Sequence, residues 1–335
     1  MTTKLLIVGY SGETHVGTHF RNAAIQLGIS CKLVDAYYAY NAHQILIRMN
    51  WRLRGRRPTF LNTFSKLVVE ECQIFKPDYV IVTGITPPNA QALRTIHLMG
   101  IPCVNYLTDD PWNTAHYSSW FSEAQFLYSM IFSPRESNLG DIRHLGVKAV
   151  YLPFAYAPEV HYPQSPPDDL QAQYICDVLF YGGADRDRLP YIRQLIDAGL
   201  NVHLYGGYWN RFAETRLAAK GVANAQTLRW AVSKAKITLC LVRQANRDGH
   251  VMRTYEAPAM GACMLTEETE EHKRILGDEG ESVVYFSSTN MLIEKAKQLL
   301  KNDQQRLSLI QKARQKITGS PNTYLDRLKT MLEYV

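Results

Sequence analysis

No apolar stretch in this 335-residue sequence is long enough to cross a bilayer. A membrane-spanning helix needs about 18 to 20 consecutive apolar residues. The first residues, MTTKLLIVGYSGE, turn polar too early for a signal peptide. Since the hydrophobic content is 46% and the charged content 20%, we expect a cytoplasmic globular protein whose length fits two domains.

Paired cysteines are also missing. The chain has six cysteines but no CxxC motif, which argues against a zinc site and against a disulfide framework. Most of them lie within or beside apolar runs, so we interpret them as buried thiols in a reducing compartment. They are Cys31, Cys72, Cys103, Cys176, Cys240 and Cys263.

Two ligand-binding motifs are absent as well. The glycines after the first strand do not fit G-x-G-x-x-G, and Asp35 is a weak ribose ligand, so a dinucleotide site in the first half is poorly supported. The spacing of an Asp-x-Asp metal motif occurs at Asp185 and Asp187, in a loop that we assign to phosphate. We therefore expect no metal and no cofactor.

Positive charge is concentrated in one stretch. The net charge of +6 suits an anionic small ligand, a membrane surface or nucleic acid, and decides little. Arg48 to Arg57 (RMNWRLRGRR) holds five arginines and one tryptophan. It could lie on anionic lipid, hold an acidic acceptor, or be a solvated helix end and loop. We favour the solvated interpretation, expect no nucleic acid, and leave peripheral membrane contact open.

Apolar runs alternate with helical periodicity along the first half. Strands are expected at 5–8, 31–34, 79–82, 104–107 and 130–132, and helices at 16–27, 63–75 and 90–99. Alternation of this kind predicts an α/β fold with a parallel, doubly wound sheet and right-handed crossovers.

A proline-rich stretch separates the two halves and cannot form a regular helix or central strand. We expect a first domain over 1–155, a linker over 156–172, a second domain over 173–318 and a last helix within 319–335. The second half repeats the pattern, with strands at 176–181, 202–205, 237–242, 262–265 and 282–286. Helices are expected at 189–198, 231–235, 251–260, 291–301, 303–316 and 321–335.

The densest group of polar residues lies in the stretch from Asn246 to Arg274, which follows an apolar strand. In open parallel sheets, ligands bind at the carboxyl ends of the strands. Asp248 and Glu256 flank Arg253 there. A carboxylate low on a helix can accept ribose hydroxyls, and an arginine beside free helix amides can hold a diphosphate. The alternative is a surface helix with an ordinary mix of charges.

Two other loops of the second half are candidates for the same ligand. Gly182 and Gly183 follow a strand, and a Gly-Gly turn lets backbone amides approach a phosphate that Arg186 or Arg188 could neutralise. Tyr208-Trp209 follows the next strand and could stack on a nucleobase, although packing is the commoner role of such a pair.

Loops of the first half could face a second substrate. His15 and His19 lie one turn apart after the first strand, where each could serve as a base or could only cap or pack. Asp109-Asp110 follows another strand. One of the two carboxylates could take a proton from a hydroxyl, or could cap the turn before Pro111. Adjacent side chains point in different directions, so the sequence does not separate the two.

The stretch around Glu256 resembles the donor-binding segment of GT-B glycosyltransferases, and most closely the spore-maturation protein CgeB family, with its pattern R-x-[FY]-E-x-P-A-x-G-x-x-x-L-x-E. The matching residues are Arg253, Tyr255, Glu256, Pro258, Ala259, Gly261, Leu265 and Glu267, followed by Glu271-His272. The resemblance is specific over about thirty residues. The wider retaining group carries a Glu-x7-Glu motif, whose first glutamate falls here on Asp248, one methylene shorter.

This resemblance implies two Rossmann-like domains that face a central cleft. It also implies transfer of a sugar, without a metal, from a nucleotide diphosphate donor to an unknown acceptor. The motif favours retention of the anomeric configuration of the sugar. It places Glu256 on the donor ribose, Arg253 and Arg188 near the diphosphate, and Asp248 near the sugar. The expected donor-binding residues are Gly182, Gly183, Arg186, Arg188, Tyr208, Arg253, Tyr255 and Glu256; the expected catalytic ones are Asp109, Asp110, His15 and Asp248. The alternatives are a nucleotide-sugar epimerase of the same fold and a non-catalytic binding protein.

Overall fold

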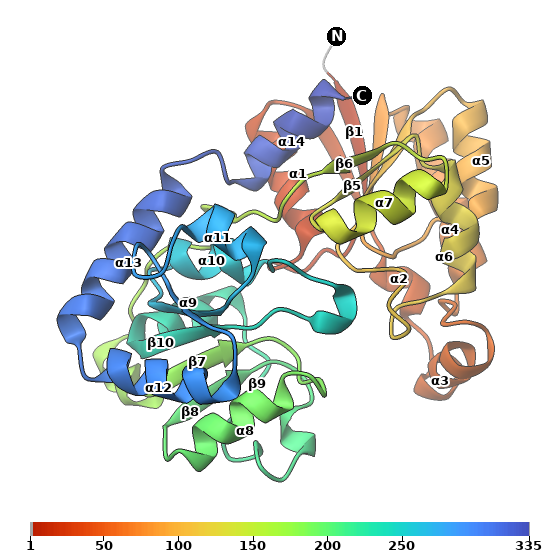
Figure 1. Cartoon of the computed structure of the whole chain (residues 1–335). Helices are drawn as coiled ribbons and strands as arrows, with labels where there is room; N and C mark the ends of the chain where they lie inside the picture. The colour runs from red at the N-terminus through yellow and green to blue at the C-terminus, as the bar shows by residue number, and fades with distance from the viewer. Residues whose placement is uncertain (1–2, 335) are drawn as a thin grey trace. The chain divides into compact units, whose positions relative to one another are not determined.

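The computed structural model describes residues 3–334 and divides the chain into two compact units (Figure 1). Residues 1–2 and 335, at the outer ends of the expected first domain and last helix, lie outside the description. Unit 1 comprises Met1–Pro153, Ala245–Arg247 and Tyr324–Val335; unit 2 comprises Phe154–Gln244 and Asp248–Thr323. The stretch expected as a linker, 156–172, therefore belongs to unit 2. There Tyr156 bridges to Thr323 and His161 is buried.

Unit 1 is built on a parallel six-stranded sheet with the order β2-β1-β3-β4-β5-β6. Its strands are β1 (Lys4–Gly9), β2 (Ser30–Asp35), β3 (Tyr79–Thr83), β4 (Cys103–Tyr106), β5 (Met130–Ser133) and β6 (Ala149–Tyr151). Leu5 to Val8 are fully buried on both faces of β1. A continuous apolar run in a central strand is what a sheet covered by helices on both faces requires.

Helices cover this sheet and connect its strands. They are α1 (Val16–Gln26), α2 (Tyr37–Tyr40), α3 (Gln44–Leu53), α4 (Leu61–Phe75), α5 (Ala90–Leu98), α6 (Ser119–Ala124), α7 (Glu136–His144) and, from the end of the chain, α14 (Tyr324–Glu333). Helix α14 packs on α1, where Tyr324 meets the rings of Phe20 and His19 (Figure 1).

Unit 2 holds a second parallel six-stranded sheet, with the order β12-β11-β10-β7-β8-β9. The strands are β7 (Cys176–Tyr181), β8 (Val202–Tyr205), β9 (Ala219–Gly221), β10 (Ala235–Cys240), β11 (Met264–Glu267) and β12 (Val284–Phe286). The helices are α8 (Leu189–Asp197), α9 (Ala225–Lys234), α10 (Arg253–Ala259), α11 (Glu270–Leu276), α12 (Thr289–Leu300) and α13 (Asp303–Thr318). Short 3-10 turns include Trp209–Arg211 and Gln244–Asn246.

The expected α/β class is confirmed, because both sheets are parallel and flanked by helices. The elements that the sequence analysis missed are the ten-residue helix α3 and the shorter α2, α6, α7, α11, β6 and β9. All six cysteines are free thiols, five of them buried. Within residues 3–334, no helix is both long and apolar enough to cross a membrane.

Candidate functional site

Two glycine pairs close the carboxyl ends of neighbouring strands in unit 2. Gly182-Gly183 follows β7 and Gly206-Gly207 follows β8. The amide of Ala184 donates to the Gly207 carbonyl at 2.9 Å. A Cβ on Gly206 would lie 2.3 Å from the Gly182 carbonyl oxygen, and its φ is +136°. Only glycine allows this approach of backbone to backbone, so the turn predicted to receive a phosphate is tightly built.

Arg253, the first residue of α10, lies buried directly beneath this turn. Its Nε donates to the Tyr181 carbonyl at 2.7 Å, its Nη2 donates to the same oxygen, and its Nη1 donates to the Leu241 carbonyl at 3.5 Å. The guanidinium carbon lies 4.5 Å from the ring centre of Phe180. A Cβ on Gly182 would come within 2.6 Å of Nη2. A guanidinium has five N–H groups, and after these three bonds and a side-chain contact with Cys240 at most one remains for a ligand.

Arg188 adds a second guanidinium near Phe180, with its carbon 5.5 Å from the ring centre. It is buried and donates to the Gly183 carbonyl at 3.0 Å. Burial, with the positive charge of Arg253 next in size, lowers the pKa of Arg188 to about 10. Asp185 partly balances this charge, since its Oδ2 lies 3.4 Å from Arg188 Nε and 3.6 Å from Arg243 Nε. The loop therefore gathers cations around a glycine turn.

Glu256, one turn along α10 from Arg253, carries a carboxylate that is only 11% exposed. Burial raises its pKa to about 7, although the nearby Arg253 opposes the rise. His161 Nε2 lies 3.6 Å from Glu256 Oε1. His161 Nδ1 accepts a hydrogen bond of 2.9 Å from the Ala157 amide, so in the neutral ring Nε2 carries the proton and points it at the carboxylate.

A network of buried polar side chains holds α10 in place. His250 accepts from the Phe154 amide through Nε2 at 3.2 Å, and its Nδ1 faces Glu271. His272 lies 2.7 Å from the Glu267 carbonyl through Nδ1 and 3.0 Å from the Thr254 hydroxyl through Nε2. Burial lowers the pKa of His272 to about 4, so this ring is neutral. The network fixes the turn of helix that presents Arg253 and Glu256.

Asp248 lies in the loop before α10 and is half-buried. Its amide donates to the Arg243 carbonyl, and its Oδ2 accepts from the Arg243 amide, both at 3.3 Å. These bonds close the 3-10 turn Gln244–Asn246 and fix the position of the Asp248 carboxylate.

The remaining expected donor residues are placed less favourably. Tyr255 is 2% exposed and packs against His250, so it supports α10 from the core instead of lining a surface. Arg186 is exposed on the outside of its loop. Tyr208 is 57% exposed, has a φ of +75°, and stacks on Arg211, with 4.2 Å from ring centre to guanidinium carbon. Its neighbour Trp209 is a core residue that donates to the Gly182 carbonyl at 2.8 Å.

In unit 1 the structure separates Asp109 from Asp110. Asp110 is 1% exposed and accepts from Arg247 at 2.7 Å (Nε to Oδ2) and 3.1 Å (Nη2 to Oδ1). It also accepts from the Trp112 amide at 2.9 Å. The Asp109 side chain is 36% exposed and lies 3.8 Å from His116 Nε2. Asp110 is therefore held in a buried ion pair, whereas the Asp109 side chain is partly exposed.

The two histidines of the first loop also differ. His15 is half-buried, contacts the Tyr37 hydroxyl at 3.1 Å through Nε2, and lies beside the ring of Tyr10. Burial lowers its pKa, while Asp35 opposes the shift. His19 is 1% exposed and stacks on Tyr324 at 4.8 Å between ring centres. Of the two, only His15 lies at the surface.

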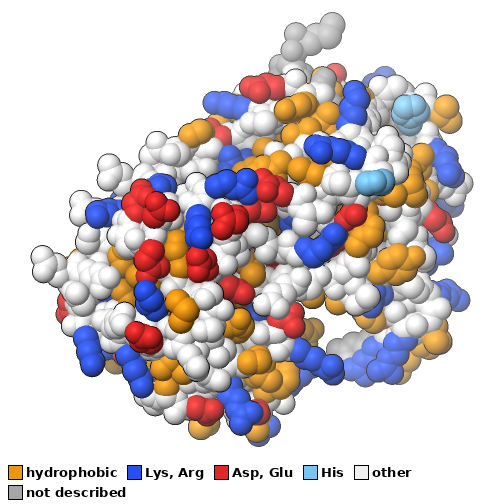
Figure 2. Space-filling model, viewed as in Figure 1, with side chains coloured by type: hydrophobic (Ala, Val, Ile, Leu, Met, Phe, Trp, Pro, Cys, Tyr) orange, Lys and Arg blue, Asp and Glu red, His pale blue; other side chains and the backbone are white. Residues whose placement is uncertain are grey.

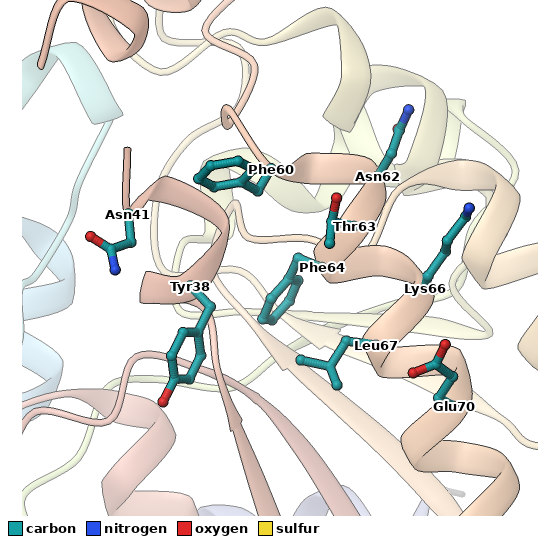
Figure 3. Close-up of a pocket in the computed structure, with 9 residues that line it drawn as sticks. All are labelled: Tyr38, Asn41, Phe60, Asn62, Thr63, Phe64, Lys66, Leu67 and Glu70. Atoms are coloured by element: carbon teal, nitrogen blue, oxygen red, sulfur yellow. The ribbon is translucent and has the colours of Figure 1, made fainter. Parts of the chain in front are cut away.

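A cavity of about 650 Å³ lies elsewhere in unit 1, between α2 and the start of α4 (Figure 3). The rings of Tyr38, Phe60 and Phe64 border it, whereas Asn62 and Lys66 point the other way from α4. None of the residues expected to bind donor or acceptor lines it, so we do not assign the donor to this cavity.

Two site residues were missed by the sequence analysis. His161 lies in the stretch expected as a linker, and its approach to Glu256 depends on tertiary packing. Glu271 was noted only as the end of the family pattern, yet it pairs with the fully buried His250. A signal for Glu271 was present, because it stands next to His272 at the end of the family pattern. No sequence signal marks His161.

Comparisons with known proteins agree with this architecture. Residues 188–333 match the family model described as glycosyl transferase-like. This match confirms the expected enzyme class, glycosyltransferase, at the level of that domain. No curated protein matches the chain.

Many solved structures share the fold at low identity. Sucrose-phosphate synthase from Thermosynechococcus elongatus aligns with a TM-score of 0.67 and 10% identity, over 99% of this chain and 98% of that one. T4 phage BGT in complex with its UDP-glucose substrate aligns with a TM-score of 0.62 and 15% identity, over 99% of both chains. A Listeria monocytogenes protein described as a UDP-N-acetylglucosamine 2-epimerase aligns with a TM-score of 0.58 and 14% identity, over 99% of this chain and 95% of that one. The GT-B fold is therefore confirmed.

Proposed function

We propose that this protein transfers a sugar from a nucleoside diphosphate donor to an acceptor, with the donor held by unit 2. One observation carries the proposal. Two buried guanidiniums, Arg253 and Arg188, lie at the Gly182 turn at the carboxyl ends of parallel strands, and the buried carboxylate of Glu256 lies one helical turn from Arg253 on α10. This is the edge of an α/β sheet where ligands bind, and the three groups match a pentose diol and a diphosphate.

Each group has a distinct part in this proposal. The ionised Glu256 carboxylate accepts hydrogen bonds from the two ribose hydroxyls, and His161 contacts the same carboxylate and holds it in place. Arg253 and Arg188 offer N–H groups to the diphosphate and stabilise the negative charge that grows on it as the glycosidic bond breaks. Asp248 lies next to the sugar. Guanidinium groups can balance this charge, so we propose a reaction that needs no metal.

We propose that the acceptor contacts unit 1 near Asp109 and His15. The two-carboxylate spacing of Asp248 and Glu256, and the resemblance to the CgeB family, favour retention of the anomeric configuration. Asp109 then orients the acceptor hydroxyl. UDP-glucose is the first donor to test, because T4 phage BGT, which shares the fold, is described with UDP-glucose as its substrate.

Calorimetry with UDP, GDP, ADP and dTDP, each with and without a chelator, tests the donor site. We expect tight binding of one nucleoside diphosphate and no effect of the chelator. Binding of none would contradict the proposal. The Listeria structure of similar fold supports an epimerase as the alternative. Incubation with the nucleotide sugar alone distinguishes an epimerase from a transferase. An epimerase yields an altered nucleotide sugar, whereas a transferase without its acceptor yields at most a slow hydrolysis product.

Asp109→Asn and Asp110→Asn are expected to fail in different ways. The first should lower the transfer rate about 100-fold at unchanged stability, because an orienting carboxylate contributes in this range. The second should lower the free energy of unfolding by about 2 kcal/mol, because it weakens the charged hydrogen bonds between the buried Asp110 and Arg247, which keeps only its ion pair with Asp141. Steady-state kinetics and urea unfolding measure the two. If Asp109→Asn keeps full activity, the acceptor role of Asp109 is wrong.

A further inference from the structure

Helix α3 of unit 1 has no buried residue, although it is ten residues long. A surface helix normally buries an apolar stripe against its domain. In α3 only Ile47 and Asn50 are even half-buried, and Asn50 donates to the Thr59 hydroxyl at 3.2 Å. The other side chains of the helix are exposed. This helix therefore keeps its apolar residues in solvent, which needs an explanation.

The exposed apolar residues form one face. At 3.6 residues per turn, four of them fall within an arc of about 100°. They are Ile45 (60% exposed), Leu46 (48%), Met49 (51%) and Leu53 (76%). Aromatic side chains close by in sequence are exposed as well: Tyr37, Tyr38, Trp51 and Phe60. Exposed apolar residues gathered in this way mark an interaction surface.

The charge around this face has a single sign. Residues 36–69 contain five arginines and one lysine but no aspartate or glutamate. Arg48, Arg52 and Arg54 are exposed. Arg56 and Arg57 are fixed by bonds to the Tyr117 carbonyl and to Asn62. Figure 2 shows Lys and Arg side chains gathered where Figure 1 places α3.

We propose that α3 binds the surface of an anionic lipid bilayer. An apolar face bordered by arginines is the pattern of a helix that lies in the plane of a membrane interface. The apolar arc enters the boundary between headgroups and acyl chains, and the arginines contact lipid phosphates. A nucleic acid would use the arginines but not the apolar arc. This proposal is independent of the donor site, because binding is measured without donor.

Vesicle flotation with the full chain tests the proposal. We expect binding to phosphatidylcholine vesicles that contain phosphatidylglycerol, and little binding to phosphatidylcholine alone. Raising the salt from about 0.1 M to 0.5 M should release much of the protein, since it screens the arginines. Equal binding to both vesicle types, or to neither, would overturn the proposal.

Two variants separate charge from insertion. Arg48→Ser with Arg52→Ser and Arg54→Ser should weaken binding about 100-fold, because each basic residue near an anionic surface contributes about fivefold. Leu46→Ser with Met49→Ser keeps every charge and should weaken binding at least about tenfold through lost apolar contact. Neither should change the unfolding midpoint, because α3 buries no side chain.

Matched controls remove the same chemistry from other exposed positions. Lys301→Ser with Lys312→Ser and Arg314→Ser removes three positive charges, and Leu217→Ser with Leu307→Ser removes two exposed leucines. Both controls should bind vesicles like the unmodified protein. If the Leu46 and Met49 variant also binds normally, the surface is a site for polyanions and the membrane proposal is wrong. The membrane proposal is also wrong if the α3 variants bind vesicles normally but lose a dimer that sedimentation detects in the unmodified protein.

Discussion

Glu256→Ala should weaken nucleoside diphosphate binding about 100-fold. Hydrogen bonds to a charged group contribute about 1.5–3 kcal/mol each, and the proposed contact has two of them. The side chain lies in a buried site beside His161, where water replaces such bonds poorly. Titration calorimetry with the nucleotide that the unmodified protein binds measures the loss.

A deoxy ligand makes this test specific. The 2′-deoxynucleotide should bind the unmodified protein about tenfold more weakly, but should bind Glu256→Ala as well as the ribonucleotide does. Glu294→Ala, which removes an exposed carboxylate from α12, is the matched control and should change nothing. If Glu256→Ala leaves affinity intact, the ribose assignment is wrong.

The affinity should also depend on pH. Burial raises the pKa of Glu256 to about 7, and only the ionised form accepts two hydroxyl bonds, so nucleotide affinity should fall as the pH drops from 8 to 6. Because the phosphate titrates in the same range, the difference between the unmodified protein and Glu256→Gln isolates the carboxyl.

The same shift predicts a change in stability. The folded protein holds the Glu256 proton more tightly than the unfolded chain between the ordinary value near 4.5 and about 7, so stability contributed by this group is lost as pH rises through that window. At pH 8, Glu256→Gln should be more stable than the unmodified protein by about 1–3 kcal/mol. Thermal or urea unfolding at pH 5 and pH 8 measures the difference, which should vanish at the lower pH.

Arg253→Ala should lower the free energy of unfolding by about 3–5 kcal/mol. The substitution leaves the carbonyls of Tyr181 and Leu241 without their donor and opens a cavity beside Phe180. Arg253→Lys should cost less but still weaken binding, because an ammonium cannot reach both carbonyls as the planar guanidinium does. Urea unfolding and calorimetry on both variants, in the temperature range where each is folded, check the prediction.

Arg186→Ala is the matched control, since this exposed arginine follows the same glycine turn. Its unfolding free energy should stay within about 0.5 kcal/mol of the unmodified value. Arg253 variants that are as stable as the unmodified protein would show that the guanidinium contacts contribute nothing. A folded Arg253→Ala with unchanged nucleotide affinity would leave Arg253 only its structural role.

Much of the fold was predictable because its strands and helices follow from local sequence patterns. The strands at Cys176–Tyr181 and Val202–Tyr205 were predicted to the residue, since each is a short apolar run bounded by turn residues. Helix α3 was not predicted as an element, although its apolar residues have helical spacing, because the arginines of 48–57 were interpreted as a solvated helix end and loop. The linker expected at 156–172 became part of unit 2, because prolines exclude regular structure without excluding burial.

The candidate site was predictable in part. Arg253 and Glu256 are one helical turn apart, so their shared position on α10 follows from spacing alone. The sequence also marked the Gly182 turn, but not that Arg253 lies beneath it, 71 positions further along the chain. Tyr255 lies in the same motif, yet packing places it in the core.

By itself, the sequence determined the parallel strands, the loops that follow them and the group of polar residues around Glu256, since backbone periodicity and turn chemistry act between near neighbours. Only the tertiary structure gave Asp109 and Asp110 different surroundings. Arg247, 137 residues away from Asp110, pairs with the buried Asp110 carboxylate, while the Asp109 side chain stays partly exposed beside His116. The tertiary structure also brought His161 close to Glu256, and burial in the fold raised the pKa of the Glu256 carboxyl. Charge pairing and burial are set by groups that meet only when the chain is folded, which is why no local pattern reveals them.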